Sequence, residues 1–342
     1  MRTLGIAAVQ LRLSLAELAS EGAFQRAVWR AAQAASDAVK GADHRLFVYP
    51  EAVGHLAVLA RASAFARRRA TLSGAVAAIA ARRPAAVLAG MWEARKVNPR
   101  AGAVAAIADE TEALVRETFA EVARRHGATV VAGSHFCRTG QGGVTNRSFT
   151  FDPAGALVGV TDKVNLVPGL EDDAPGGLGL TAGRADAIPV LKTGFGRLAT
   201  LICYDGFAVA HTPAERFACA ASIVDDAGAD VVANPAANPW PWHGPWALGR
   251  PGDERLRREQ WAEEGLPAAL AGLRRVRYGV TAQLCAEVLD VRFDGRSQIL
   301  ERRGGDGVRV VAEAKTHDQA DIVAAVVPAC EGATARRPGS SL

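Results

Sequence analysis

Short apolar runs alternate along this chain with amphipathic and loop-like stretches, a pattern that predicts a mixed α/β protein. An apolar run at residues 3–10 and another at Leu46–Tyr49 enclose an amphipathic helical stretch at residues 15–40, and the second run stops at Pro50 and Glu51. Strands joined partly by hairpins and partly through helices favour a mixed sheet system covered by helices. The later part of the chain is expected to add helices at 213–227 and 254–276 and strands at 128–133, 148–151, 156–160, 197–202, 230–233, 278–284, 297–301, 308–312 and 322–327.

The segment at residues 55–127 is dominated by alanine and arginine. It is predicted to be helical, with breaks near Gly74, Pro84 and Pro99–Gly102, and to form an enlarged excursion from the fold. The sequence shows neither an internal repeat nor a domain linker, so we expect a single domain over residues 1–330. Residues 331–342 are expected to form a flexible tail.

Two glycine- and proline-rich stretches and one turn divide the second half of the chain. The tetrad Asp152–Gly155 is typical of a tight turn, so the strands on either side of it are predicted to form a hairpin. Residues 167–183 are rich in glycine and proline, and residues 234–253 combine proline with three tryptophans. Both stretches are predicted to be loops that follow strands.

Composition narrows the class of protein. The 342 residues are 49% apolar, and 40 basic against 36 acidic side chains leave a net charge of +4. So small a surplus argues against nucleic acid or an anionic membrane as the main partner. The five cysteines form no CxxC pair, which disfavours a disulfide framework or a metal cage. The chain has no apolar run of the roughly 18 to 20 residues that a membrane helix needs, and no signal-peptide pattern. We therefore expect a cytoplasmic protein.

Three residues with reactive side chains end or follow predicted strands: Glu51 after the run LFVYP, Lys163 in TDKVNLVP, and Cys203 in LATLICYDG. With these contexts the chain resembles the nitrilase superfamily of carbon-nitrogen hydrolases, whose members have a Glu, a Lys and a nucleophilic Cys in this order. The resemblance covers most of the chain. It is most specific at residues 146–171 and 195–206, because each short motif taken alone would be weak.

The resemblance implies a four-layer α-β-β-α sandwich whose protomers pair into a homodimer or a higher oligomer. It implies a small amide, carbamoyl or nitrile substrate with water as the second reactant, and no metal or organic cofactor. A second carboxylate of the family, found a few residues after the lysine, matches Glu171. This residue is expected to orient Lys163 or the amino group of the substrate.

The three residue types suit the attack on an amide. An amide carbonyl is a poor electrophile, and a thiol with an ordinary pKa of about 8.5 supplies little thiolate. Glu51 would take the proton from Cys203, while the ammonium of Lys163 would favour the thiolate and then the oxyanion. The backbone N–H of Tyr204, next after the nucleophile, is the second expected oxyanion donor. Glu51 would then protonate the leaving amine and activate the water that hydrolyses the thioester.

Lysine is rare in this chain, and its rarity bears on the catalytic assignment. The chain contains five lysines among its 40 basic residues, so arginine serves wherever any cation is enough. A lysine beside a reactive loop therefore suggests that a compact ammonium is required at Lys163.

The loop at residues 234–246 would, by resemblance, line the mouth of the pocket. Asn238, Trp240 and His243 are candidate substrate contacts, although tryptophans packed on prolines to stiffen the loop are an equal alternative. His243 has no second ligand at a useful spacing, so no metal site is predicted. The pair Arg257–Arg258 is predicted to lie on a solvated helix face.

Other functions remain open on the same residues. A nitrilase, an N-acyltransferase or a glutaminase would use the same Glu51, Lys163 and Cys203, although no synthetase domain accompanies a glutaminase here. A catalytically inactive relative that binds a ligand is the alternative from another class. The complete set of three residues argues against it, because a binding protein has no need of all three.

Overall fold

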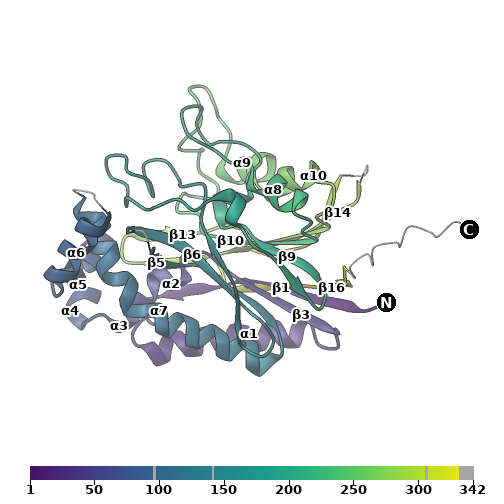
Figure 1. Cartoon of the computed structure of the whole chain (residues 1–342), viewed down its shortest axis with the longest axis horizontal. Helices are drawn as coiled ribbons and strands as arrows, with labels where there is room; N and C mark the ends of the chain where they lie inside the picture. The colour runs from purple at the N-terminus through teal and green to yellow at the C-terminus, as the bar shows by residue number, and fades with distance from the viewer. Residues whose placement is uncertain (95–97, 141, 305–306, 331–342) are drawn as a thin grey trace, which may run out of the picture.

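Two stacked β-sheets lie between two layers of helices (Figure 1). The computed structural model describes residues 1–94, 98–140, 142–304 and 307–330, and the predicted tail at 331–342 lies outside them. Apolar residues from the two sheets, such as Ile6 and Val280, pack against each other and form the central layer of the core.

The first sheet has the order β16–β1–β3–β4–β6–β5, with β7 also paired to β6. Its strands β1, β3 and β4 run parallel to one another, and the others are antiparallel to their neighbours. The predicted hairpin is present as β6 and β7. The bounds are β1 Thr3–Gln10, β3 His44–Tyr49, β4 Thr129–Ala132, β5 His135–Arg138, β6 Val144–Phe151, β7 Leu157–Asp162 and β16 Asp321–Pro328.

The second sheet has the order β15–β14–β11–β10–β9–β8, with β9, β10 and β11 parallel at its centre. A small third sheet pairs β13, β12 and β2. The bounds are β8 Val190–Thr193, β9 Gly196–Thr200, β10 Val231–Ala236, β11 Tyr278–Gln283, β14 Gln298–Arg302 and β15 Val308–Glu313, and for the third sheet β2 Arg12–Ser14, β12 Cys285–Val288 and β13 Val291–Phe293.

The long helices α1 and α7 cover the first sheet, and α8 and α10 cover the second (Figure 1). The helix α7 begins at Pro99 under an Asn98 cap and ends at Gly127, whose φ of +55° suits a glycine C-cap. The bounds are α1 Glu21–Ala38, α2 Val53–Leu56, α3 Val58–Arg61, α4 Ala64–Arg67, α5 Leu72–Ala80, α6 Pro84–Ala94, α7 Pro99–His126, α8 Ala220–Asp226, α9 Arg257–Glu264 and α10 Leu266–Ala271, with short 3-10 helices η1 Ala185–Ala187 and η2 Cys203–Gly206.

Two predicted helices differ from the structure. The helix expected at 213–227 is only α8, because the side chain of Asn165 occupies both backbone groups of Ala218. The helix expected at 254–276 is divided into α9 and α10 at Gly265. The strands β2, β5, β8, β12 and β13 were not predicted.

Among the described residues, no single helix is long and apolar enough to cross a membrane. The helices α5 and α6 are together long and apolar enough to cross a membrane, but the chain bends by 100° between them.

Candidate active site

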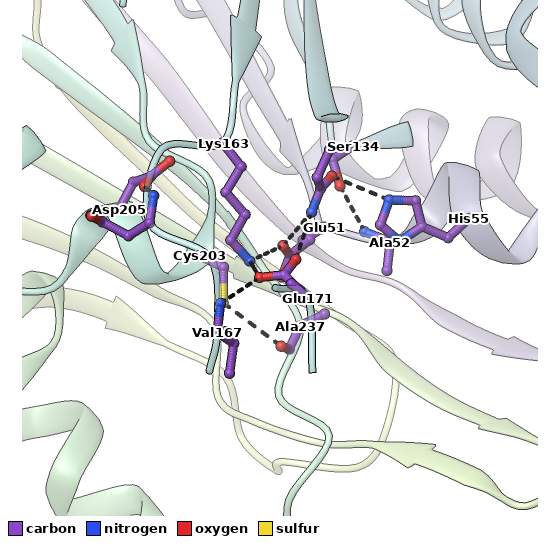
Figure 2. A network of polar contacts seen from close by, with 12 residues as sticks. Glu51, Ala52, His55, Ser134, Lys163, Val167, Glu171, Cys203, Asp205 and Ala237 are labelled. Atoms are coloured by element: carbon purple, nitrogen blue, oxygen red, sulfur yellow. Dashed lines mark hydrogen bonds and ion pairs between the residues drawn. The ribbon is translucent and has the colours of Figure 1, made fainter. Parts of the chain in front are cut away.

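Glu51 is fixed at the carboxyl end of the parallel strand β3, one residue after Pro50. Only 4% of the residue is exposed. The next residue, Ala52, has a left-handed φ of +62°, and its N–H donates to Oγ of Ser134 at 3.0 Å. This sharp turn ends the strand and leaves the Glu51 carboxylate inside the protein (Figure 2).

Lys163 directly follows β7, and its backbone N–H donates to the carbonyl of Asn146 on β6 at 2.8 Å. Its Nζ lies 2.8 Å from Oε1 of Glu51 and 2.7 Å from Oε2 of Glu171. The residue is 1% exposed. The ammonium therefore links the two carboxylates that the sequence had associated with it (Figure 2).

Asn146 is a site residue that the sequence reasoning missed. Its Nδ2 donates to Oε1 of Glu51 at 2.9 Å and to Oε1 of Glu171 at 3.3 Å, and the residue is completely buried. The sequence contains no distinct signal for it, because Asn146 is one of several polar residues in β6. Glu171 also accepts a hydrogen bond from the N–H of Val167 at 2.9 Å, so both of its oxygens are engaged.

Cys203 lies three residues beyond the end of β9, in a strained turn. Its φ is +48°, a region that non-glycine residues rarely occupy and that often marks a functional position. Asn234 on β10 holds the turn through hydrogen bonds to the carbonyls of Leu201 and Cys203 at 2.7 and 3.0 Å. The Sγ atom points toward the carbonyl of Ala237 at 3.7 Å and the residue is 4% exposed (Figure 2).

Asp205 connects the turn that contains Cys203 to the residues that follow Lys163. Its carboxylate accepts hydrogen bonds from the N–H groups of Val164 and Asn165, the shorter one at 2.7 Å. These are the two residues that follow Lys163, so the bonds fix the spacing between Lys163 and Cys203. Burial raises the pKa of Asp205 to about 7, against the opposing effect of these hydrogen bonds.

The charges of the site act on one another. Burial raises the pKa of Glu51, and the neighbouring charge of Glu171 adds to this, while Lys163 opposes it. Burial alone would lower the pKa of Lys163, but the carboxylates of Glu171 and Glu51 outweigh it, and the pKa lies well above its ordinary value. Lys163 is therefore a permanent cation.

The surroundings of Cys203 favour its protonated form. Burial raises the pKa of Cys203, the charge of Glu51 raises it further, and the opposing effect of Lys163 is too small to compensate. The resting side chain is therefore a thiol rather than a thiolate.

The oxyanion donor expected at Tyr204 has the required freedom. Within the part of the chain that the structure describes, its backbone N–H has no hydrogen-bond acceptor. Tyr204 is the first residue after Cys203 in η2, and its ring stacks on His211 with centroids 3.7 Å apart.

The three candidate substrate contacts have different surroundings. Asn238 is completely buried and uses its amide within the protein: Nδ2 donates to the carbonyls of Trp240 and Asp294, and Oδ1 accepts from Arg257. Trp240 is half-buried beside the Arg257 guanidinium. His243 is exposed and hydrogen-bonds to Arg258 at 2.9 Å. Their role as substrate contacts stays a prediction.

The described residues include no group of three or more His, Cys, Asp or Glu side chains arranged to hold a metal ion. The cluster of Glu51, Glu171 and Lys163 is occupied by its own ammonium, which contacts both carboxylates. An ammonium between two carboxylates, close to a thiol, can support proton transfer and nucleophilic attack.

The sequence model of the carbon-nitrogen hydrolase family matches residues 5–249. A comparison with curated proteins gives no significant match. Among solved structures, the chain is similar to a carbon-nitrogen hydrolase from Helicobacter pylori G27, with a TM-score of 0.60 and 14% identity over 95% of this chain and 89% of that one.

The chain is also similar to an amidase from Nesterenkonia sp. AN1. One structure, with a TM-score of 0.54 and 17% identity over 96% of this chain and 94% of that one, shows Michael addition of acrylamide at the active site cysteine of a mutant. Another, at a TM-score of 0.53 and 17% identity over 96% and 90%, shows covalent addition of the acetamide moiety of fluoroacetamide at that cysteine. At these identities the likeness concerns the fold, and it confirms the expected α/β fold class.

Proposed function

Because the chain belongs to the carbon-nitrogen hydrolase family, we propose that it hydrolyses an amide or a carbamoyl amine through a thioester on Cys203. The observation that carries this proposal is the buried ammonium of Lys163, bonded at 2.8 and 2.7 Å to Glu51 and Glu171 beside the strained nucleophile turn. A fixed cation and a carboxylate of raised pKa are what the attack of a protonated thiol requires.

In the proposed first half-reaction, Sγ of Cys203 attacks the carbonyl carbon while Glu51 takes the thiol proton. The carbonyl oxygen becomes an oxyanion, which Lys163 Nζ and the N–H of Tyr204 stabilise. When the intermediate collapses, Glu51 returns the proton to the leaving nitrogen. Ammonia or an amine departs, and the acyl group stays on sulfur.

In the second half-reaction, Glu51 accepts a proton from water, which attacks the thioester carbon. The second tetrahedral intermediate collapses with return of the proton to Cys203, and the acid is released. Glu171 is a positioning residue here. It holds Lys163 and, through Asn146, shares a hydrogen-bond donor with Glu51.

A panel of amides, carbamoyl amines and nitriles, assayed for ammonia release and for the acid or amide product, tests the proposal. We expect Cys203→Ala to lose at least about 10³-fold in kcat, because the covalent route is removed. The matched control is Cys219→Ala, which removes a thiol that is more exposed and contacts Oγ of Ser222 at 3.2 Å. Intact-mass measurement with a slow substrate should show an acyl adduct in the control and none in Cys203→Ala.

The same panel separates the alternatives. Turnover of nitriles alone would favour a nitrilase, and acyl transfer to hydroxylamine in preference to water would favour an N-acyltransferase. Undiminished turnover in Cys203→Ala would refute the thioester, and no turnover with reversible ligand binding would indicate an inactive relative. A single domain, a homo-oligomer and a cytoplasmic location stay predictions.

A further inference from the structure

One arginine outside the catalytic cluster is buried without a counter-charge. Arg257, the first residue of α9, is 2% exposed, although the sequence predicted a solvated position for it. Its Nε donates to Oδ1 of Asn238 at 2.8 Å and its Nη1 donates to Oε1 of Gln260 at 2.5 Å. Both partners are neutral, and the structure shows no carboxylate of a described residue within ion-pair distance of the guanidinium.

The donors of this guanidinium are only partly used. A guanidinium has five N–H groups, and the two bonds to Asn238 and Gln260 leave the others without an acceptor among the described residues. Glu264, the last residue of the same helix, already pairs with Arg255 at 2.7 Å and accepts from Gln260 at 2.7 Å. A buried cation with free donors is costly unless an anion joins it.

Three tryptophan rings lie around the guanidinium. The Cζ atom lies 4.0 Å from the ring centroid of Trp246, 4.9 Å from Trp240 and 5.4 Å from Trp261. Ring faces stabilise the charge by cation–π interaction. They accept no in-plane hydrogen bond, so the N–H groups at the edge of the guanidinium remain available to a ligand.

The position of α9 excludes the helix N-terminus as the anion site. The N–H groups of Arg257 and Arg258 donate to the carbonyls of Gly244 and Trp242, and the N–H of Glu259 donates to Leu256. The first turn is thus satisfied, and the helix dipole adds a further positive contribution beside the guanidinium. The free binding capacity therefore belongs to the side chain of Arg257.

The guanidinium lies near the nucleophile. Asn238, which binds Arg257, directly follows Ala237, whose carbonyl lies 3.7 Å from Sγ of Cys203. Trp240 and Trp261 belong to the same apolar cluster as Cys203. Burial lowers the pKa of Arg257 to about 9, and the strongest effect in the opposite direction arises when Cys203 is a thiolate. The guanidinium is therefore close enough to respond to a negative charge at Cys203.

We propose that Arg257 binds a carboxylate of the substrate, so that the enzyme prefers amides or carbamoyl amines that carry a carboxylate a few bonds from the scissile carbonyl. This inference rests on the proposed function, since it assigns the substrate class of that site. The carbonyl lies at Cys203 and Lys163, and the carboxylate forms an ion pair with the guanidinium between the tryptophan rings.

The test compares amides that differ only in charge, namely succinamic and glutaramic acid against the neutral diamides of the same length. We expect kcat/KM to be at least tenfold higher for the acids in the wild-type protein. Arg257→Gln should reduce it at least 100-fold for the acids and less than threefold for the diamides, and Arg257→Lys should keep part of the preference. The matched control is Arg45→Gln, which removes another arginine that bonds to neutral oxygens, Oγ of Ser36 and the carbonyl of His126.

An equal loss for acids and diamides in Arg257→Gln would show that Arg257 only supports the loop, and the proposal would be wrong. A wild-type preference for the diamides would refute it as well.

A binding measurement keeps this test separate from the proposed hydrolysis. Succinamic acid is titrated into Cys203→Ala while the tryptophan fluorescence is followed, with succinamide as the neutral reference. Saturable binding of the acid that Arg257→Gln abolishes in the same background supports the anion site even if the wild-type protein hydrolyses no amide. Tighter binding of the diamide than of the acid refutes it.

Discussion

The substitution Glu171→Gln tests the electrostatics of the catalytic cluster. Glu171 and Glu51 contact the same Lys163 Nζ at 2.7 and 2.8 Å, so the two oxygens lie no more than about 5.5 Å apart. The charge of Glu171 helps to raise the pKa of Glu51, after the larger effect of burial. The neutral glutamine removes this repulsion, and the pKa of Glu51 should fall.

The size of the shift follows from Coulomb's law. At an effective dielectric constant of about 20, unit charges about 5.5 Å apart interact by about 3 kcal/mol, which corresponds to about two pKa units. Each carboxylate spreads its charge over two oxygens and Lys163 lies between them, so we expect a shift of about one to two units. Because Glu51 must be ionised to act as the base, the acid limb of kcat/KM against pH should move to lower pH.

The assay is the pH profile of kcat/KM between pH 4 and 9 for the best substrate of the panel. We expect kcat to fall as well, because Lys163 loses one of its two partners, and the free energy of unfolding to fall by about 1 to 3 kcal/mol. Asp172→Asn is the control: it removes a charge from the same loop that bonds to the N–H groups of Gly169 and Ala174. An acid limb that stays in place, or moves to higher pH, would refute the electrostatic account of Glu51.

Two further substitutions probe neighbouring groups. Asn146→Asp places a third carboxylate against Glu51 and Glu171 and removes the donor that they share, so kcat/KM at pH 7 should fall at least about 100-fold. The acid limb of the pH profile should move to higher pH, opposite to its shift in Glu171→Gln. An acid limb that does not move would contradict the assigned contacts. Burial lowers the pKa of His211 to about 2, so below pH 6.5 the unfolded state binds a proton that the folded state does not, and stability falls by up to about 1.4 kcal/mol per pH unit. His211→Phe should make the loss shallower in urea denaturation at pH 7.5, 6.0 and 5.0, and an unaltered slope would exclude this origin.

The three principal side chains could be selected from the sequence because three short motifs occur in the order typical of the family, each beside a predicted strand. Glu51, Lys163 and Cys203 come directly or shortly after apolar runs, and the runs are the strands β3, β7 and β9. The strands β3 and β7 belong to the first sheet and β9 to the second, so the stacking of the two sheets brings the three residues together. The predicted contact between Lys163 and Glu171 is also present, at 2.7 Å.

The sequence did not indicate what holds these groups in place, because each supporting contact joins distant segments. Asn146 bonds to Glu51, 95 positions away, and Asp205 bonds to Asn165, 40 positions away. Neither pairing has a local pattern. The same reason explains why the helix predicted at 213–227 is shorter in the structure. The side chain of Asn165 hydrogen-bonds to both backbone groups of Ala218, so these groups are not available to a helix.

The two buried cations differ in a way that assigns them different tasks. Lys163 is 1% exposed and compensated by two carboxylates, whereas Arg257 is 2% exposed and compensated by none. A compact ammonium can contact both carboxylates and still direct an N–H toward an oxyanion, while a planar guanidinium suits a planar anion. The proposed carboxylate site therefore implies one orientation of the substrate, with its anion toward α9 and its carbonyl toward Cys203.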